Sequence, residues 1–494
     1  MAVTSEIPVL IVGAGPTGLT AALELSRLGV PVRIVDRAPH PSPTSRALAV
    51  QARTLELLRV RGVGDEMLSA GHRASAAALH AGGRELASIE LFRMSSDFNF
   101  ILMLAQSETE RLLTEQLARQ GVKVDRGVEV TAVNSGSDGE PVRVTLEGAH
   151  GAGETLSANY VIAADGPHST LRKALAMDFP GRTLPHNYVL ADLHIDGDIV
   201  ADQVSIFLAA GGFVALFPMG AHRFRLMATD PHGLVAADSD PSVEHLQTLY
   251  DRVVHVPARL HDLNWSSRFR INSRHVRALR SGRVYFGGDS AHVHSPAGGQ
   301  GMNLGIQDMI NLSWKLAMVH EGRAKPELLD TYSERLPVIR RLVGFTEMGT
   351  RIFNSTNPIV HAVRVRVAPR ALARDRIQDA AAAMFGQLSA GYRGSALSEG
   401  GGGLGELRAG DRVPDTEGLY DGLDLSALTL FADTGSRRVV EVARDWTGVV
   451  AIRDRPAPHG GWLLVRPDGY LAAAGGPADG AALQRWLQRW FVKP

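Results

Sequence analysis

The residues best suited to ligand chemistry lie in one stretch, Gly287–Trp314, with the sequence GGDSAHVHSPAGGQGMNLGIQDMINLSW. Asp289 follows a short apolar strand, and a carboxylate at a strand end commonly binds hydroxyl groups. The glycines of the stretch let a flat ligand approach the backbone closely. Apolar spacing predicts a helix over Met302–Val319, whose N-terminal N–H groups favour negative charge. The stretch therefore predicts a site for a large ligand with one polar edge, the alternative being a glycine-rich surface loop.

A second ligand signature occupies the N-terminus. The apolar run Pro8–Val12 predicts a buried parallel strand, and a helix is predicted over Thr20–Leu28. Between them lie Gly13, Ala14, Gly15, Pro16, Thr17 and Gly18, and the next strand, Val32–Val35, ends at Asp36. This strand, glycine turn, helix and strand, with an acid about 20 residues on, form a dinucleotide fingerprint. The pattern predicts an ADP-containing cofactor with its pyrophosphate on the helix N-terminus and its ribose on Asp36.

Three arginines follow this unit at positions 37, 46 and 53. An arginine beside a pyrophosphate can bind it bidentately. Arg37 and Arg46 are therefore predicted to contact the cofactor, whereas Arg53 is equally well read as an ordinary surface residue.

Composition limits the possible classes of function. The 494 residues are 45% hydrophobic, enough for a sizeable globular core. Lys+Arg and Asp+Glu both number 52, which argues against a nucleic-acid or membrane partner attracted by overall charge. The chain has no cysteine, so disulfides, thiolate nucleophiles and cysteine metal ligands are excluded. Neither a signal peptide nor a membrane span is evident, and a cytoplasmic protein is expected.

The order of predicted elements indicates an α/β protein with an insertion. Residues 1–72, 102–177 and 276–350 are expected to form the nucleotide-binding domain. Residues 73–101 and 178–275 are expected to form a mostly antiparallel substrate domain. A helical connection and linker, 351–399, leads to a C-terminal α/β domain at 405–494, and the run Gly400–Gly403 predicts a flexible link before it.

These motifs together resemble one known family. The GAGPTG turn with Asp36, the pair Asp165–Gly166, and the string GDSAHVHSPAGGQGMNLGIQD resemble the three-motif pattern of class A flavoprotein monooxygenases. Those enzymes share the para-hydroxybenzoate hydroxylase fold. The run LLVRPDGYLA (Leu463–Ala472) resembles the thioredoxin-like C-terminal domain of the phenol and aromatic-polyketide hydroxylase branch. The implied fold has a Rossmann-type FAD-binding domain, an inserted antiparallel substrate domain and a thioredoxin-like C-terminal domain, which without cysteine is structural.

The resemblance implies FAD as cofactor and NAD(P)H as co-substrate. Besides the N-terminal unit, it implies FAD contacts at Arg46, Gln106, Val130, Asp165, Gly166, Asp289, Pro296, Gly299, Gln300, Gly301, Met302 and Asn303. Asp289 is expected at the ribityl chain and Pro296–Asn303 at the pyrimidine edge of the flavin, where N–H groups favour negative charge. His292 and His294 are expected to pack the loop rather than to act in catalysis.

The implied reaction is hydroxylation of a phenolic or polyketide-like aromatic by O₂ through a flavin C4a-hydroperoxide. Candidate wall residues are Phe207, Phe213, Leu216, Phe217, Met219, Arg225 and Met227, each equally able to be sheet core because alternate strand residues face opposite sides. The sequence indicates neither a particular catalytic base nor an oligomeric state. Baeyer–Villiger oxygenation, oxidative inactivation of a polycyclic compound and non-catalytic ligand binding by a flavoprotein are the alternatives.

Overall fold

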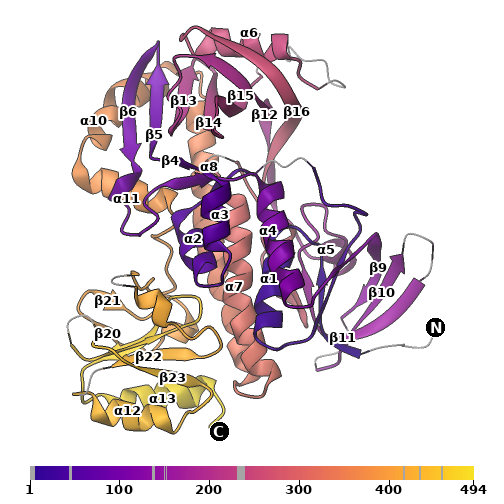
Figure 1. Ribbon diagram of the computed structural model, residues 1–494, viewed down its shortest axis with the longest axis vertical. Coiled ribbons are helices and arrows are strands. Elements are labelled where there is room, and N and C mark those ends of the chain that lie inside the picture. Colours follow the sequence, from indigo (N-terminus) through magenta and orange to yellow (C-terminus); the bar gives the residue numbers. More distant parts are fainter. Residues whose placement is uncertain are drawn as a thin grey trace.

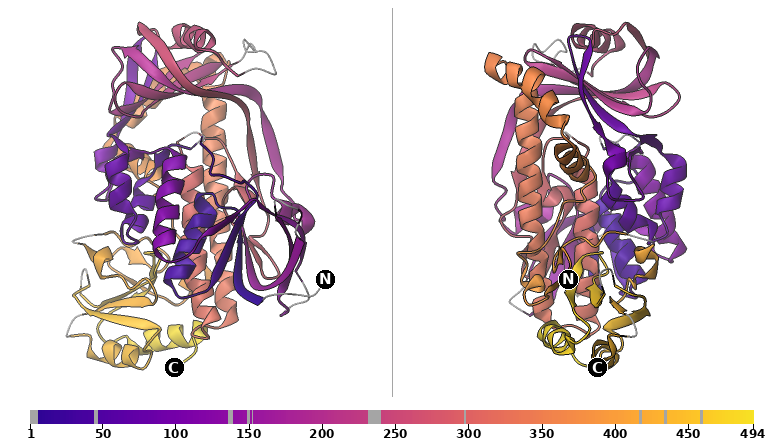
Figure 2. Two further views of the ribbon diagram at one scale, coloured as in Figure 1. Left: turned by 45° about the vertical axis from the view of Figure 1, so that its right-hand side comes forward. Right: turned by 90° about the vertical axis from the view of Figure 1, so that its left-hand side faces the viewer.

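The structure is a computed structural model of the chain. It describes residues 6–43, 47–135, 139–148, 151, 153–230, 240–296, 298–415, 418–432, 435–457 and 460–494. Two large sheets lie one above the other along the molecule, and a smaller C-terminal sheet lies at the lower end (Figure 1). Two further views show the long helices α7 (Gly301–His320) and α8 (Arg335–Phe353) running along the molecule, with α8 packing against the upper sheet (Figure 2).

The lower large sheet contains the N-terminal fingerprint. Its strand order is β17 (Arg280–Ser281), β18 (Val284–Phe286), β11 (Gly153–Ala163), β1 (Glu6–Val12), β2 (Val32–Asp36) and β8 (Val124–Arg126). From β18 to β8 all pairs are parallel, while β9 (Val128–Asn134) and β10 (Val142–Gly148) extend the sheet antiparallel from β11. Helix α1 (Pro16–Arg27) packs against α4 (Gln106–Arg119) and α7. This is a Rossmann-type arrangement, in which ligands bind at the carboxyl ends of the strands.

The upper sheet is formed mainly by the inserted segments. Its order is β19 (His292–Val293), β16 (Ala258–His275), β12 (Gly181–Gly197), β15 (Arg223–Thr229), β14 (Gly212–Pro218), β13 (Gln203–Ala209), β5 (Ala76–Ala81) and β6 (Arg84–Glu90). Only the β13–β5 pair is parallel. Helix α6 (Val243–Val253) covers one face, with Leu246, Leu249 and Tyr250 in a shared apolar core. The opposite face is directed toward the lower sheet (Figure 1).

Short elements join the two large sheets. A small sheet has the order β3 (Ala49–Val50), β7 (Ile101–Met103) and β4 (His72–Ala74). The connecting helices are α2 (Ala52–Arg59), α3 (Gly64–Ala70), η1 (Leu91–Arg93), α5 (Thr170–Ala174), η2 (Gly288–Ser290) and η3 (Pro326–Glu334). After α8 come α9 (Pro358–Ala362), the π-helical η4 (Val363–Val367), α10 (Ala368–Leu372), α11 (Asp375–Phe385) and η5 (Ala396–Ser398).

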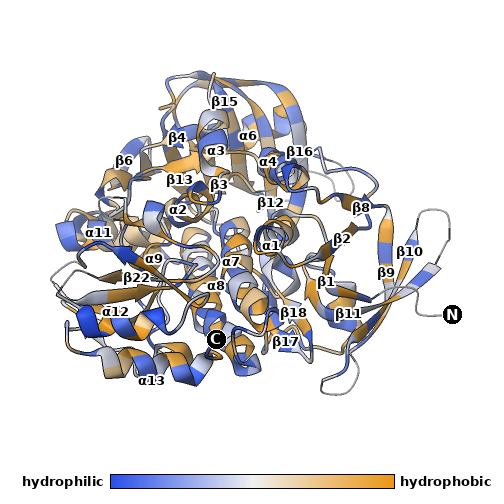
Figure 3. Cartoon of the chain, turned by 60° about the horizontal axis from the view of Figure 1, so that its bottom comes forward, coloured by the Kyte–Doolittle hydropathy of each residue, from blue (hydrophilic) through white to orange (hydrophobic). Residues whose placement is uncertain are grey.

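The C-terminal domain has a four-stranded mixed sheet. Its order is β23 (Val450–Asp454), β22 (Leu428–Ala432), β24 (Trp462–Val465) and β25 (Leu471–Gly475). The other elements are the hairpin β20 (Gly403–Leu404) and β21 (Leu407–Arg408), with η6 (Leu419–Gly422), α12 (Arg437–Arg444) and α13 (Gly480–Trp490). Both α12 and α13 show polar and apolar sides (Figure 3), consistent with helices that cover one face of the sheet.

The glycine run at 400–403 differs from its expected role as a flexible link. Gly403 begins β20, and the carbonyl of Gly401 accepts a hydrogen bond from the Ala474 N–H at 2.7 Å. A Cβ on Gly401 would lie 2.4 Å from the Ala472 carbonyl oxygen. Gly401 and Gly402 are therefore needed for close packing against β25 rather than for flexibility. Within the described residues, no helix has both the length and the apolar character needed to cross a bilayer.

Candidate functional site

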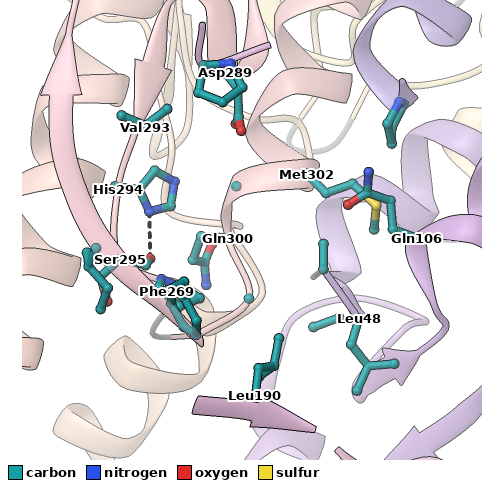
Figure 4. Close-up of a pocket in the computed structure, with 18 of the residues that line it drawn as sticks. Leu48, Gln106, Leu190, Phe269, Asp289, Val293, His294, Ser295, Gln300 and Met302 are labelled. Carbon is teal, nitrogen blue, oxygen red and sulfur yellow. Dashed lines mark hydrogen bonds between the residues drawn. The ribbon is translucent and has the colours of Figure 1, made fainter. Parts of the chain in front are cut away.

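A cavity of about 440 Å³ lies between the two large sheets (Figure 4). Its lining combines residues that are far apart in the sequence: Gly15, Pro16, Thr17, Ala47, Leu48, Ala49, Gln106, Ala164, Gly166, Pro167, Leu190, Phe217, Arg225, Met227, Phe269, Arg270, Ile271, Asn272, Asp289, Val293, His294, Ser295, Pro296, Gly299, Gln300, Gly301 and Met302. The N-terminal turn and the Gly287–Trp314 stretch thus border one space, as a ligand with two ends requires.

The three glycines of the N-terminal turn have different surroundings. A Cβ on Gly13 would lie 2.2 Å from the Ala164 carbonyl oxygen, and one on Gly18 would lie 1.8 Å from the Gly13 carbonyl oxygen. These two positions allow close packing of turn, helix and neighbouring strand. Gly15 has no protein atom within 4 Å of such a Cβ and borders the cavity, so it leaves space for a ligand at the α1 N-terminus.

Two acids near this turn already hold backbone groups. The Asp36 carboxylate accepts the N–H of Ala14 at 2.6 Å and that of Ala38 at 2.8 Å, and each oxygen retains acceptor capacity. One oxygen of Asp165 accepts from Thr170 and Leu171 at the start of α5. The other, Oδ1, is buried and has no hydrogen-bond partner among the described residues. Both acids therefore shape the turn region and keep acceptors for a ligand.

Several predicted cofactor residues lie outside the cavity lining. Arg37 is exposed just beyond β2, and Val130 is buried in β9. Gly13, Ala14, Gly18, Asp36, Asp165 and Asn303 are not lining residues. Arg46 lies outside the described residues. Arg53, which the sequence left between cofactor and surface, is buried and contacts the C-terminal domain instead, donating to the Tyr420 hydroxyl at 2.6 Å.

Thr17 joins the two ligand motifs directly. A Cβ on Gly288 or on Gly305 would lie 2.3 Å from Thr17 Oγ1. The first turn of α1, the turn after β18 and helix α7 therefore meet at a point where only glycine fits. This contact fixes Asp289, which borders the cavity, relative to the N-terminal turn.

The loop before α7 is held by amide side chains. Asn303 Nδ2 donates to the carbonyls of Ala49 and Gly299 at 2.8 and 2.9 Å, and its Oδ1 accepts the Gln51 N–H at 2.8 Å. Gln300 Oε1 accepts from Gln387, whose own Oε1 accepts from Gln307 at 2.5 Å. The side chain of the N-cap residue Gln300 makes no capping hydrogen bond to α7, and no acid lies in the first turn of the helix, so the helix N-terminus keeps its positive partial charge for a ligand.

The two histidines of this loop have different environments. His292 is 1% exposed, and its Nε2 lies 2.7 Å from Asp308, as expected for a packing residue. His294 borders the cavity, and its Nδ1 lies 2.8 Å from the Ser295 carbonyl oxygen (Figure 4). Nδ1 must therefore carry the proton, which leaves Nε2 as an acceptor, buried and without a hydrogen-bond partner among the described residues. Burial lowers the pKa of His294 to about 4, so the ring is neutral at pH 7.

Strand register decides which upper-sheet residues face the cavity. Phe217 pairs with Arg225, and Met227 pairs with Leu190, so these four side chains share the lower face, and all four border the cavity. Phe207 and Leu216 belong to the core under α6 and do not border it, which corrects their assignment as wall residues. Phe213 lies on the same face of the sheet as Phe217, but it packs against Phe353, with ring centroids 5.9 Å apart, and does not border the cavity. Met219 does not border the cavity either.

An ion pair in this wall was not predicted from the sequence. Arg225 donates to both carboxylate oxygens of Asp192 at 2.7 and 2.8 Å, and Trp265 Nε1 donates to the same carboxylate at 2.7 Å. The three residues are direct cross-strand neighbours in β15, β12 and β16. Arg225 also donates to the Ala47 carbonyl at 3.1 Å, which links the upper sheet to the lower domain. The sequence feature that could have indicated this ion pair is Asp192 itself, a charged residue within an otherwise apolar stretch of β12.

The geometry fits an FAD molecule that spans the two motifs. An open glycine and a free helix N-terminus suit its pyrophosphate, and the uncapped start of α7 suits the polar edge of its ring. The unpartnered Oδ1 of Asp165 and Nε2 of His294 are buried acceptors, as expected where a ligand supplies the donors.

Comparisons with known proteins agree with this geometry. A family model described as "FAD binding domain" matches residues 6–346, and one described as "Aromatic-ring hydroxylase, C-terminal" matches residues 407–494. The chain is 36% identical to 6-methylpretetramide 4-monooxygenase of Streptomyces rimosus, covering 98% of this chain and 94% of the relative. It is 33% identical to pentachlorophenol 4-monooxygenase of Sphingobium chlorophenolicum, covering 84% and 76%.

Solved structures are similar over almost the whole chain. The OxyS anhydrotetracycline hydroxylase of Streptomyces rimosus has a TM-score of 0.80 at 29% identity, covering 99% of this chain and 100% of that one. CabE, an aromatic hydroxylase from angucycline biosynthesis, has a TM-score of 0.78 at 32% identity, covering 98% and 99%. The chain therefore belongs to the family of FAD-dependent aromatic-ring hydroxylases, monooxygenases that use NAD(P)H and O₂ to hydroxylate an aromatic substrate.

Proposed function

We propose that this monooxygenase hydroxylates a polycyclic, uncharged phenol of the polyketide type. The observation that carries the proposal is the composition of the upper cavity wall. Leu190, Phe217, Met227, Phe269 and Ile271 form an apolar surface, and the charge of Arg225 is neutralised by Asp192. The buried part of this wall favours burial of a large ring system and offers a carboxylate substrate little attraction.

Substrate size follows from the extent of the wall. The lining reaches from buried residues such as Leu190 to Arg270 and Asn272, which are exposed on β16. A polycyclic compound would bury its rings against the apolar part and place polar substituents at this rim. The relatives named for 6-methylpretetramide and anhydrotetracycline support the same substrate class.

The chain's own residues would position the cofactor. Gly13–Gly18 and Asp36, with Arg37 and Val130, would hold the ADP half, and Asp289 and Gln106 the middle. Pro296–Asn303 would place the ring, and the N-terminus of α7 would favour negative charge at its pyrimidine edge. When bound, FAD takes a hydride from NAD(P)H and supplies, with O₂, the oxygen that enters the aromatic ring. The apolar wall would exclude water from that transfer.

The experiment is a substrate comparison with FAD-reconstituted enzyme. Polycyclic phenols and single-ring phenols, with and without a carboxylate, are tested for stimulation of NADPH oxidation, and products are identified by mass and NMR. We expect the uncharged polycyclic phenols to give the highest kcat/KM and a ring-hydroxylated product. Preferred turnover of a single-ring carboxylate would contradict the substrate proposal, and a ring-expanded lactone would indicate Baeyer–Villiger chemistry instead.

A pair of variants tests the wall itself. Phe217→Ala removes a ring from the cavity wall, and we expect KM for the polycyclic substrate to rise roughly tenfold because apolar contact area is lost. Phe92→Ala, which removes a ring that is 63% exposed on the surface, is the control and should leave KM unchanged.

A further inference from the structure

One surface of the molecule combines exposed apolar and cationic side chains. It lies on the helical segment α9–η4–α10, where Ile359, Val363 and Val367 are 73%, 48% and 56% exposed. The arginines at positions 366, 370 and 374 are exposed on the same segment and its C-terminal end. We call these six residues the cationic apolar face. Exposed large apolar side chains that are grouped on one segment mark an interaction surface.

The orientation of this segment is fixed by a buried arginine. Arg364, 3% exposed, donates to the carbonyls of Ile352 and Phe353 at the end of α8 and to the Ala209 carbonyl in β13. The segment is thereby attached to α8 and to the upper sheet on its inner side. Helix α10 also packs against β6, at the outer edge of that sheet (Figure 1). The cationic apolar face therefore points away from the protein.

The neighbouring helix α8 extends the same character. Its exposed apolar residues are Phe345, Met348 and Ile352, and its exposed arginines are Arg340, Arg341 and Arg351. The only acidic residue in the sequence from 335 to 374 is Glu347, and the next two acids, Asp375 and Asp379, both pair with Arg93. Glu347 is bound by Arg182 and by the Ser273 hydroxyl, so it does not compensate the arginines of the face. A locally cationic surface thus exists in a chain whose net charge is zero.

We infer that the cationic apolar face docks the enzyme on an anionic lipid surface. Apolar side chains among arginines are typical of helices that lie in the membrane interface, where the aliphatic groups enter the acyl boundary and the guanidinium groups contact phosphates. A symmetric contact between two copies is disfavoured because it would bring two equally cationic patches together. Binding would be peripheral, since no described helix can span a bilayer. Docking here would place the substrate sheet next to the lipid phase.

Vesicle co-sedimentation of the full-length, FAD-loaded enzyme tests this inference. The probes are phosphatidylcholine vesicles with and without phosphatidylglycerol. We expect binding only to the anionic vesicles and its loss at high salt. Substituting Arg366, Arg370 and Arg374 by Gln should weaken binding roughly fivefold per arginine. Substituting Ile359, Val363 and Val367 by Ser should weaken it by about tenfold or more.

A matched control separates the face from arginine content in general. Arg437, Arg438 and Arg444 are exposed on α12 in the C-terminal domain, and their triple Gln variant should bind anionic vesicles like the unchanged enzyme. Equal binding to neutral and anionic vesicles, or equal loss in the control, would overturn the inference. So would a shift of the apolar variant from dimer to monomer in analytical ultracentrifugation without change in vesicle binding, because it would assign the face to a second copy. FAD content and activity in solution should be unaffected, so failure here leaves the proposed function intact.

Discussion

The carboxylate of Asp308 accepts the backbone N–H of Gly288 at 3.0 Å, so a residue of α7 fixes the turn that carries Asp289. The same carboxylate accepts from Arg335 Nε at 2.7 Å and lies 2.7 Å from His292 Nε2. All three side chains are at most 1% exposed. Arg335 lowers the pKa of Asp308 against the opposing effect of burial, so the carboxylate is charged and both of its oxygens are engaged by these three partners.

Asp308→Asn tests the importance of this charge for the turn. The variant leaves the Arg335 guanidinium buried without its counter-ion, and we expect the free energy of unfolding to fall by roughly 3–5 kcal/mol. FAD affinity should fall as well because Asp289 loses its fixed position. The measurements are urea unfolding and FAD titration of the apoprotein. Asp330→Asn breaks only the exposed pair with Arg280 and should cost less than about 1 kcal/mol; equal effects of the two substitutions would refute the distinction.

Gly15→Ala and Gly18→Ala separate ligand space from packing space. The Gly15 variant should fold with stability changed by less than about 1 kcal/mol, because no atom beyond its chain neighbours lies within 4 Å of the new Cβ and only the N-cap preference for glycine over alanine is lost. Its FAD dissociation constant should rise roughly tenfold or more, since the methyl group enters the space proposed for the pyrophosphate. Gly18→Ala should instead destabilise the fold itself by about 1–3 kcal/mol. If the Gly15→Ala variant bound FAD with normal affinity, the proposal that the pyrophosphate lies at this turn would be wrong.

The low pKa of His294 predicts that the free energy of unfolding decreases in mildly acidic solution. Its pKa is about 4 in the folded protein and 6.5 unperturbed, so between these values the unfolded chain binds the extra proton and the folded chain does not. Stability contributed through this residue is therefore constant above pH 6.5 and decreases as pH falls toward 4, by at most about 3 kcal/mol. Urea unfolding across this interval measures it. His294→Phe should show a correspondingly flatter pH dependence, and parallel curves would exclude His294 as the cause.

Glu334→Gln tests how the C-terminal domain is attached. Glu334 Oε1 accepts from Arg466 of that domain at 2.6 Å and from Lys315 of α7 at 2.7 Å, and all three side chains are at most 1% exposed. Burial lowers the pKa of Lys315 to about 8 despite this partner. We expect a loss of roughly 3–5 kcal/mol and faster hydrogen exchange in β24 and β25. Glu399→Gln, which breaks an exposed pair with Arg489, should change neither measurement.

The motifs could be predicted from the sequence because each is a continuous string with its own backbone requirement. The glycine turn, Asp36 and the α7 start needed only local spacing, and the structure places α7 within one residue of its predicted ends. The wall residues depend on register between strands far apart in the chain. Phe207 and Phe217 looked equivalent in the sequence, and only the strand pairings, Phe207 with Val214 and Phe217 with Arg225, assign them to opposite faces.

The cavity residues that were not predicted from the sequence also depend on contacts between distant parts of the chain. Phe269–Asn272 lie in the long strand β16, whose path past both domains no local pattern reveals. Asp192 needed its partner Arg225 from another strand to be recognised as a buried ion pair. Opposite charges in two apolar strands are the sequence feature that could have indicated this pair.

Helix α7 has a practical consequence for exchanging parts between related enzymes. Its first residues, Gly301 and Met302, border the cavity, whereas Asn311, about 15 Å further along, donates to Asp468 of the C-terminal domain at 3.0 Å. A chimera that takes its C-terminal domain from a relative would have to import the matching residues on α2, α7 and η3 with it. Without them the buried charges are mismatched, and the error is carried along a rigid helix to the loop that borders the cavity. The natural unit of exchange is therefore the domain together with its docking side chains.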